Sequence, residues 1–470
     1  MMSWAKGGAM IETATFSERR LNLADLLPGI PVFLPSGESR HRNYPAYTYP
    51  FRATSHYLFF GGPNRPGQVL MVLNGDATLY RATPPSDDAM WHGTGESDEE
   101  LMKRYDLNAV KSFEELTEDV ATLGKDEVLA LPTPDSATNR FIESYLGREP
   151  NLDNDPDVDL VDAIMELRRC QDQGAITELK AATKATVKLQ KTVLAACRPG
   201  VTEGQLKGEL DRVLATEGWS TSFQPIISIE GEILHNPHYR NSLNDGDLLL
   251  VDCGAEIESG YAGDLTRTVP VSGTYSATQK SIYDIVDQAR ADAIDMIAPG
   301  VHFADLHKKA SLTICEGLVK LGILKGDPAD LVDKGVHALF FCHGLGHLVG
   351  LDVHDMEDFG DRIGYEEGEE RSQQFGLSNL RLSRELETGM VVTIEPGYYN
   401  VPAILNGEIG RQFDEFLDRN VLEQYKDVRG IRIEDVVLVT EDGFENLSAD
   451  LPTSSDQIVG LLGKVTANAS

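Results

Sequence analysis

Acidic residues interrupt four segments that otherwise look like buried strands. They are Asp252 in LLLVDCG, Asp264 in GYAGDLTRT, Glu395 in VTIEPG and Glu434 in IRIED. Because a carboxylate buried without a partner is costly, each should be protonated, paired or bound to a metal. One such acid more often caps a turn or forms an ion pair, but four in one part of the chain favour a metal site.

Three histidines lie close together in CHGLGHLVGLDVHD, at His343, His347 and His354. A lone histidine among apolar residues is more often a core group than a ligand. Here glycines alternate with the histidines, and glycine lets the backbone approach closely enough for imidazoles to converge. The HxxxH spacing also fits a zinc pair on one helix face, but the internal glycines disfavour that helix and HExxH is absent.

Four carboxylates and an imidazole form an oxygen-rich ligand set. Such a set suits Mn, Mg or Ca, and the imidazole also admits Zn, Co or Fe. Two cations about 3.5–4 Å apart can ionise a shared water and stabilise the oxyanion that follows its attack. This chemistry needs no serine or cysteine nucleophile, and the sequence has no convincing GxSxG motif or Cys–His pairing.

The segments around these residues alternate between helix and strand signals. Apolar runs that end in acids and glycine predict strands at 248–257 and 390–399, and a third strand is expected at 431–440. Helices are expected at 276–298, 302–322 and 328–341. The charged, glycine-rich segment 355–388 is expected to be a solvated surface loop.

A chain of 470 residues predicts two domains. The first part reads as an α/β domain, with strands in 56–82 and short helices at 97–107 and 112–124, each opened by a serine with glutamate three residues on. A long helical stretch follows at 160–197. We place the boundary near 172, which gives domains 1–172 and 173–470 of an α/β (α+β) protein.

Composition excludes several classes of function. Hydrophobic residues make up 41% and charged residues 25%, as in ordinary globular proteins, and no apolar run approaches the roughly 20 residues that span a bilayer. The net charge of −33 disfavours nucleic acid and anionic membranes as partners. Five widely spaced cysteines without CxxC, and an N-terminal segment without the apolar core of a secretory signal, favour a reducing, cytoplasmic location.

Five motifs resemble those of the pita-bread metallopeptidases, namely prolidase (Xaa-Pro dipeptidase) and aminopeptidase P. The motifs occur in the family's order and are ILHNPH, LLLVDCGAEIESGYAGDLTRTVPVSG, CHGLGHLVGLDVHD, MVVTIEPGYY and GIRIEDVVLVTEDGFENLS. The first half, with RATSHYLFFGGP, looks more loosely like the creatinase-type N-terminal domain of the family. The resemblance implies that this domain precedes a pita-bread catalytic domain.

The resemblance also implies a role for each acid. Asp252 would bind one metal, Asp264 and Glu434 would bridge both, and His347 and Glu395 would complete the second. By resemblance the two divalent ions are Mn²⁺, while Co and Zn are chemically allowed. Glu395 matches the family's general base.

Other matched residues would contact the substrate. His354 matches the histidine at the scissile carbonyl, and His343 and His235 match further pocket histidines, with a structural role as the alternative reading. Arg432 matches an arginine near the pocket, and its alternative role is to neutralise the acid-rich site.

Arg381 in SNLRLSREL decides between two activities. It resembles the prolidase arginine that holds the C-terminal carboxylate of a dipeptide, and an arginine fork suits both carboxylate oxygens. Its alternative role is a surface ion pair with Glu385 or Glu387. Arg381 and the prolidase-like insertion before GIRIED together favour an Xaa-Pro dipeptidase. Such an enzyme would hydrolyse the peptide bond with water that both metals ionise.

Two other functions remain open at this stage. One is an Xaa-Pro aminopeptidase, which shares the metals and the bond preference but leaves the far end of the peptide free. The other is a metal-free relative that uses the cleft only to bind a partner, and this is disfavoured, like creatine hydrolysis, because the whole ligand set is present. In either peptidase the substrate is a small peptide with proline second, and the resemblance suggests a homodimer.

The hairpin between Asp252 and Asp264 departs from the family pattern. It has one intervening residue more than expected. A bulge in ESGYAG would leave both acids aimed inward, whereas a register shift would turn one of them away. A second departure is Cys342, where a proline is frequent, and this should affect loop rigidity more than chemistry.

Overall fold

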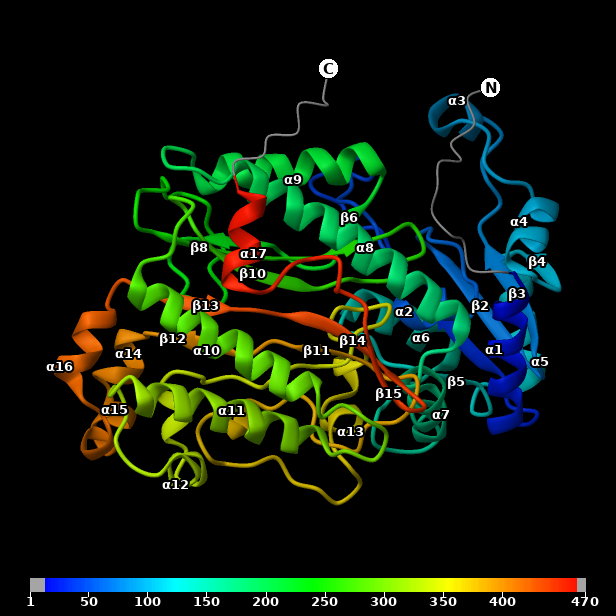
Figure 1. Cartoon of the computed structure of the whole chain (residues 1–470). Coiled ribbons are helices and arrows are strands. Elements are labelled where there is room, and N and C mark those ends of the chain that lie inside the picture. Colours follow the sequence, from blue (N-terminus) through cyan, green and yellow to red (C-terminus); the bar gives the residue numbers. More distant parts are fainter. Residues whose placement is uncertain (1–12, 463–470) are drawn as a thin grey trace. The chain divides into compact units, whose positions relative to one another are not determined.

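The computed structural model describes residues 13–462 (Figure 1). Contacts divide these residues into two compact units, 13–169 and 170–462, which we describe separately. Residues 1–12, on which the expectation of no secretory signal partly rests, lie outside the described residues, as do residues 463–470 of the expected second domain.

The N-terminal unit is built on a mixed sheet with the strand order β4-β3-β2-β1-β5. Its strands are β1 (Val32–Pro35), β2 (Gln68–Leu73), β3 (Asp76–Arg81), β4 (Ala109–Lys111) and β5 (Leu129–Ala130). The helices of this unit are α1 (Thr13–Leu26), α2 (Ser55–Phe59), α3 (Asp88–His92), α4 (Asp98–Tyr105), α5 (Phe113–Leu123), α6 (Ser136–Leu146) and α7 (Val158–Arg169). Side chains of the sheet and of α5 and α6, such as Phe33, Val69, Leu116 and Ile142, form a buried core.

Local capping signals correctly predict two short helices of this unit, α4 and α5. Ser97 and Ser112 each accept a hydrogen bond from the backbone N–H three residues on, and the glutamate there caps in return. The expectation of strands across 56–82 is confirmed for β2 and β3 but is wrong for its first residues, which form α2. Tyr57 in α2 is fully buried and donates to Gln68 at 2.8 Å, so tertiary packing outweighs the strand preference of the aromatic residues.

The C-terminal unit has helices and strands in each region where the sequence predicts them, but several differ from the predicted extent. Its strands are β6 (Ser220–Thr221), β7 (Ile226–Ser228), β8 (Leu248–Cys253), β9 (Ala255–Glu256), β10 (Leu265–Pro270), β11 (Val391–Ile394), β12 (Gly397–Tyr399), β13 (Gly430–Arg432), β14 (Asp435–Thr440) and β15 (Gly443–Asn446). Its helices are α8 (Gln173–Ala196), α9 (Glu203–Glu217), α10 (Ala277–Ile294), α11 (Phe303–Lys320), α12 (Pro328–Asp333), α13 (Asp361–Gly364), α14 (Pro402–Leu405), α15 (Glu408–Gln412), α16 (Arg419–Leu422) and α17 (Ser455–Ile458).

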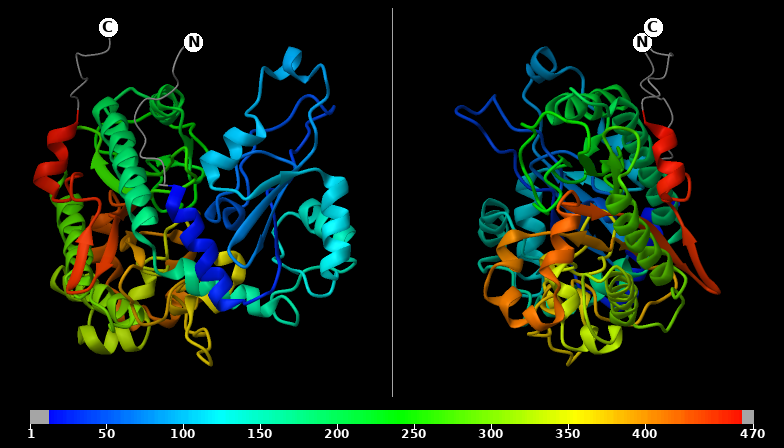
Figure 2. Two further views of the ribbon diagram at one scale, coloured as in Figure 1. Left: turned by 90° about the vertical axis from the view of Figure 1, so that its right-hand side faces the viewer. Right: turned by 60° about the vertical axis from the view of Figure 1, so that its left-hand side comes forward.

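Long helices pack against the strands of this unit in two groups. Helix α8 contacts β8, β9 and β10 and pairs with α9, while α10 contacts β11, β12 and β13 and pairs with α11. The strands form the short antiparallel sheets β10-β8-β7, β11-β14-β15, β12-β13 and β6-β9. Figures 1 and 2 show these helices running alongside the strands of this unit.

Two expected helices are shorter than the sequence pattern indicates. The stretch 160–197 is not one helix, because Asp172 accepts from the N–H of Ala175 and so begins α8 anew after α7 ends at Arg169. The helix expected at 328–341 ends as α12 at Asp333. Gly335 then adopts a φ of +79°, a left-handed conformation that stops the helix before a 3₁₀ turn at Val336–Leu339.

The expected strands 390–399 and 431–440 are each interrupted next to an acid. Glu395 and Pro396 separate β11 from β12, and Pro396 has no N–H to donate to a ladder. Ile433 and Glu434 separate β13 from β14. Both interruptions leave a carboxylate at a strand end, where it is free to point away from the ladder.

No helix in the described part of the chain is long and apolar enough to cross a membrane.

Candidate metal centre and active site

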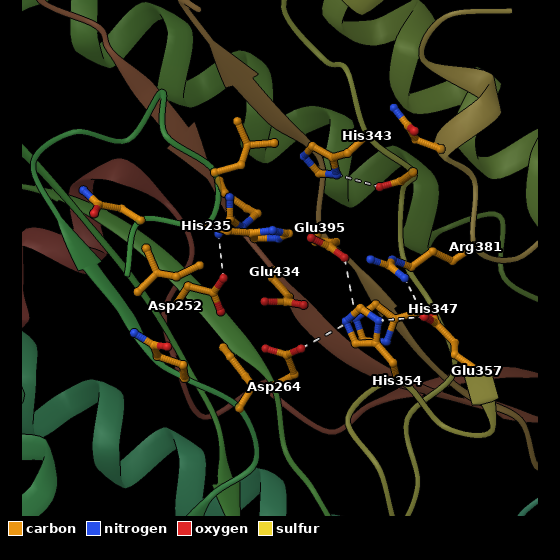
Figure 3. Close-up of a pocket in the computed structure, with 18 of the residues that line it drawn as sticks. His235, Asp252, Asp264, His343, His347, His354, Glu357, Arg381, Glu395 and Glu434 are labelled. Atoms are coloured by element: carbon orange, nitrogen blue, oxygen red, sulfur yellow. Dashed lines mark hydrogen bonds and ion pairs between the residues drawn. The ribbon is translucent and has the colours of Figure 1, made fainter. Parts of the chain in front are cut away.

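One pocket of the C-terminal unit collects every site residue that the sequence indicates. It has a volume of about 690 Å³. Its lining includes the candidate ligands Asp252, Asp264, His347, Glu395 and Glu434 and the candidate substrate residues His235, His343, His354, Arg381 and Arg432 (Figure 3).

The hairpin formed by β8 and β10 supplies the first two acids. Asp252 lies opposite Thr266 in the antiparallel ladder, and Asp264 directly precedes β10. Gly260, with a φ of +88°, makes the turn between them, and Gly263 donates back to Ala255 at 2.9 Å. The turn thus absorbs the additional residue, because both carboxylates are buried and line the same pocket.

The third and fourth acids come from the interrupted strands. The backbone N–H of Glu395 donates to the carbonyl of Leu345 at 2.8 Å. This bond joins the end of β11 to the loop that carries the three histidines, residues 343–354, which we call the histidine loop. Glu434 accepts a hydrogen bond from the Thr266 hydroxyl at 2.8 Å. Thr266 lies two residues after Asp264, so the period of the strand places both on the pocket face.

Asp435, next to Glu434, has a structural role. Its carboxylate accepts from Arg267 and Arg290, each at 2.7 Å, and all three side chains are buried. Burial would raise the pKa of Asp435, but the two guanidinium groups hold it below its ordinary value. Of this acidic pair, therefore, only Glu434 faces the pocket.

The pocket carboxylates repel one another strongly. Burial, with the charge of Glu434 as the next cause, raises the pKa of Asp264 well above its ordinary value. The same two causes raise the pKa of Glu395. Burial and the charge of Asp252 raise the pKa of Glu434 to about 8. An acid cluster of this kind is a site for positive charge.

The histidine loop presents one imidazole to these acids in a defined tautomer. Nδ1 of His347 donates to the carbonyl of Leu348 at 3.0 Å, which leaves the lone pair of Nε2 free. Nε2 lies 3.6 Å from a carboxylate oxygen of Asp264 and 3.6 Å from one of Glu395. Burial lowers the pKa of His347 well below its ordinary value, so the ring is neutral, as a ligand must be. Gly346 is required here because a side chain would collide with the carbonyl of Thr393.

The donor set fits divalent cations. Donor atoms of Asp264, His347 and Glu434 all lie within 4.8 Å of one another. Oδ1 of Asp252 and Oδ1 of Asp264 are buried and have no hydrogen-bond partner within the described residues. Buried oxygens without partners are costly unless a cation binds them. The carboxylates outnumber the metal positions, so this pocket has donors enough for two hard ions.

A hydrogen-bonded chain connects His343 to Asp252 through a residue that the sequence analysis missed. Nδ1 of His343 donates to the carbonyl of Gly344 at 2.8 Å, so Nε2 accepts from the hydroxyl of Tyr399 at 2.9 Å. Arg432 donates to that hydroxyl at 2.8 Å and to Asp252 at 2.5 Å. Tyr399 is the last residue of MVVTIEPGYY. The alternation of side chains along β12 could have indicated that Tyr399 shares a face with Gly397. It could not have indicated which residues Tyr399 contacts.

Burial and this chain fix the charges of its members. Burial, with Arg432 as the next cause, lowers the pKa of His343 to about 3, so its ring is neutral. Burial disfavours the charge of Arg432, but Tyr399 and Asp252 raise its pKa above the ordinary value. Arg432 is thus committed to Asp252 and Tyr399, which agrees with the neutralising role left open by the sequence.

Glu357 is a second residue that the sequence analysis missed. His354, whose ring stacks on His347 with centroids 4.0 Å apart, contacts Glu357 through Nδ1 at 3.1 Å. The same Glu357 oxygen accepts from Arg381 at 2.5 Å (Figure 3). The partner of Arg381 is therefore Glu357, and neither Glu385 nor Glu387. Segment 355–388, expected to be only a surface loop, contributes this pair to the pocket wall.

His235 lies in the loop after β7, which is a strand of the sheet β10-β8-β7. It lines the pocket with its side chain largely exposed to it. Burial of part of the ring, with the charge of Arg432 as the next cause, lowers its pKa. It is thus a neutral hydrogen-bonding group on the pocket wall.

Comparison with known proteins identifies the family. Residues 177–441, more than half of the chain, match the model of a family described as "Metallopeptidase family M24". The chain belongs to this metallopeptidase family. Residues 16–129 match "Aminopeptidase P, N-terminal domain", so the expected order of a creatinase-type domain and a pita-bread catalytic domain is confirmed.

Relatives are similar along nearly the whole chain. An Xaa-Pro aminopeptidase of Escherichia coli (strain K12) is 31% identical over 96% of this chain and 98% of its own length. A probable Xaa-Pro aminopeptidase of Ajellomyces capsulatus (strain H143) is 33% identical over 87% of this chain and 88% of its own.

Solved structures of aminopeptidases share the fold. An E. coli aminopeptidase P with a glutamate replaced by alanine, in complex with substrate, is 29% identical with a TM-score of 0.80, covering 96% of this chain and 98% of that chain. Pseudomonas aeruginosa aminopeptidase PepP, with the same coverage and TM-score, is 26% identical. Similarity to metallopeptidases disfavours the metal-free binding protein as a reading of this chain.

Proposed function

We propose that this chain is an Xaa-Pro aminopeptidase, which removes the first residue from peptides that have proline second. The observation that carries the proposal is the similarity to an Xaa-Pro aminopeptidase over 96% of the chain, including both matched domains. The sequence alone favours the dipeptidase, through Arg381 and the insertion before GIRIED, and leaves the aminopeptidase as the alternative. The relatives favour the aminopeptidase, and the prolidase reading is therefore the alternative.

Five side chains would hold two divalent cations. Asp252 would bind one, Asp264 and Glu434 would bridge both, and His347 and Glu395 would complete the other. The unpartnered oxygens of Asp252 and Asp264 and the free Nε2 of His347 support this assignment. We propose Mn²⁺ from the family resemblance, and Co²⁺ and Zn²⁺ also fit the donor set.

The bound cations would supply a water ionised at neutral pH and a positive charge for the developing oxyanion. Glu395 would take the proton of that water and carry it to the proline nitrogen, since a general base must lie beside the proton that it moves.

The histidines of the pocket would position the substrate. His354, when protonated on both nitrogens, would donate from Nε2 to the oxyanion, while Glu357 holds its Nδ1 at 3.1 Å. His343 and His235, both neutral, would offer hydrogen bonds to peptide groups. Arg432 would hold Asp252 in place through its 2.5 Å contact, with no free donor needed for the substrate.

The geometry of Arg381 also supports the aminopeptidase. A dipeptidase needs a free cation to hold the carboxylate that follows proline. Arg381 is instead paired with Glu357 at 2.5 Å. Because the charge of Arg381 is already balanced by Glu357, a free carboxylate on the substrate would gain less from binding there.

Rates on paired substrates test the proposal. The metal-loaded enzyme should hydrolyse Ala-Pro-Ala with a higher kcat/KM than Ala-Pro. A faster reaction with Ala-Pro would restore the dipeptidase, and the absence of hydrolysis of both peptides would contradict both activities.

We further propose that the protein is cytoplasmic and forms a homodimer. The five cysteines form no disulfide bond within the described residues, which supports a reducing compartment. The homodimer rests on the family resemblance alone.

A further inference from the structure

Arg381 lies on the wall of the pocket that holds the candidate ligands. Its side chain is 42% exposed, and its positive charge is among the influences on the pKa values of Glu395 and His347, after burial and nearer groups. A guanidinium in this position would attract the carboxylate of any short peptide bound in the pocket, because its planar fork matches a carboxylate.

Two other arginines of the pocket lining are committed to neighbours. Arg432 donates to Asp252 and Tyr399. Arg371 donates to both carboxylate oxygens of Asp361 and to backbone carbonyls of its own segment. Arg381 is therefore the arginine through which this wall could attract a negatively charged substrate end, and its partner determines how strong that attraction is.

Glu357 is that partner. One of its oxygens accepts from Arg381 at 2.5 Å and contacts Nδ1 of His354 at 3.1 Å. Its other oxygen, Oε1, is buried and has no hydrogen-bond partner within the described residues. Burial would raise the pKa of Glu357, but His354 and Arg381 lower it below the ordinary value, so the side chain carries a negative charge.

The charge of Glu357 affects the binding of dipeptides but not that of longer peptides. In an Xaa-Pro dipeptide the free carboxylate belongs to the proline itself, so it would have to displace Glu357 from Arg381 or lie near its charge. In a longer peptide a neutral amide occupies that position. The internal carboxylate therefore penalises dipeptides and leaves continuing chains unaffected.

We propose that Glu357 is a specificity-determining residue, which occupies Arg381 as an internal carboxylate and thereby excludes peptides that end directly after proline. This inference rests on the proposed function. It assigns to the pair Arg381–Glu357 the choice between dipeptide and longer substrate, and it makes Glu357 the residue that sets this choice.

Three substrates and the variant Glu357→Gln test the inference with metal-loaded enzyme. Ala-Pro, its neutral amide Ala-Pro-NH₂ and Ala-Pro-Ala differ only after the proline. Glutamine keeps the length of Glu357 and an acceptor for His354 but removes the charge. Any loss of His354 alignment would affect all three substrates, so it cancels in the ratio of kcat/KM for Ala-Pro to that for Ala-Pro-NH₂. We expect this ratio to be below one in the wild type and to rise by roughly tenfold or more in Glu357→Gln, as for a charge-assisted hydrogen bond regained.

Variants of the neighbouring residues separate the causes. The gain should disappear in the double variant Glu357→Gln/Arg381→Gln, and Arg381→Gln alone should lower the ratio below that of the wild type, because Glu357 then faces the substrate unpaired. Glu385→Gln, which removes an exposed carboxylate of the same segment outside the pocket lining, should leave the ratio unchanged. Thermal unfolding and metal content identify any variant that does not fold. If Glu357→Gln does not fold, the lowered ratio expected for Arg381→Gln still tests the inference.

The outcomes distinguish this inference from the proposed function. If the wild type does not hydrolyse Ala-Pro-Ala, the proposed function fails. If it does, but the ratio is the same in Glu357→Gln, only the inference is overturned. A gain that persists in the double variant also overturns it, because Arg381 would then take no part.

Discussion

Replacing Asp264 with alanine should abolish both metal binding and turnover. Asp264 is buried, lies within 4.8 Å of donor atoms of His347 and Glu434, and has an oxygen without a hydrogen-bond partner in the described structure. Loss of a ligand shared by both cations removes several kcal/mol of transition-state stabilisation, so kcat/KM should fall roughly a thousandfold or more. Metal content by mass spectrometry and hydrolysis of Ala-Pro-Ala measure the two effects.

The isosteric variant Asp264→Asn separates this loss from a folding defect. Burial and the charge of Glu434 raise the pKa of Asp264, which means that its ionised form costs stability when no metal is bound. In the presence of a chelator, Asp264→Asn should therefore unfold at a temperature equal to or above that of the wild type. Metal should raise the unfolding temperature of the wild type but not of the variant. A variant that binds metal and is active would refute the bridging role.

Replacing His354 with alanine should lower kcat but leave the metal content unchanged. Its ring stacks on His347 and its Nδ1 is held by Glu357, so it lies beside the ligands without being one of the five. If its Nε2 donates to the oxyanion, kcat should fall by roughly 10²–10³-fold, about 2.7–4 kcal/mol. Steady-state kinetics on Ala-Pro-Ala and metal analysis of the same preparation make this measurement.

Two further variants serve as its controls. His238→Ala removes an exposed histidine that follows His235 by three residues and is not among the residues lining the pocket, so it should leave kcat unchanged. His354→Gln retains a hydrogen-bond donor and should recover part of the lost kcat. A His354→Ala enzyme that loses its metal, or that changes KM alone, would contradict the role in stabilising the oxyanion.

Much of the fold follows from local sequence signals. The serine caps of α4 and α5 and the apolar runs of β8, β11 and β14 are local features, and the structure has these elements where the sequence places them. The prediction of one long helix at 160–197 was wrong, because Asp172 caps the start of a new helix, α8, within a stretch of continuous helical preference. Strand 390–399 is divided because Pro396 cannot join the ladder.

The site divides in the same way. Acids within apolar runs are anomalous in the sequence itself, so the four carboxylates could be named without a structure. The partners of Arg432 and Arg381 could not be named, because Tyr399 and Glu357 reach them through tertiary contacts that leave no local pattern. The sequence favoured the dipeptidase for this reason, since a free Arg381 and a paired Arg381 have the same sequence, whereas the relatives favour the aminopeptidase.

Identification of the products from Ala-Pro-Ala and Ala-Ala-Ala tests the central claim most directly. The metal-loaded wild type should release alanine and Pro-Ala from the first peptide, should act on the second much more slowly, and should lose both activities with a chelator. Release of Ala-Pro, equal rates on both peptides, or hydrolysis that persists without metal would contradict an Xaa-Pro aminopeptidase that depends on these five ligands.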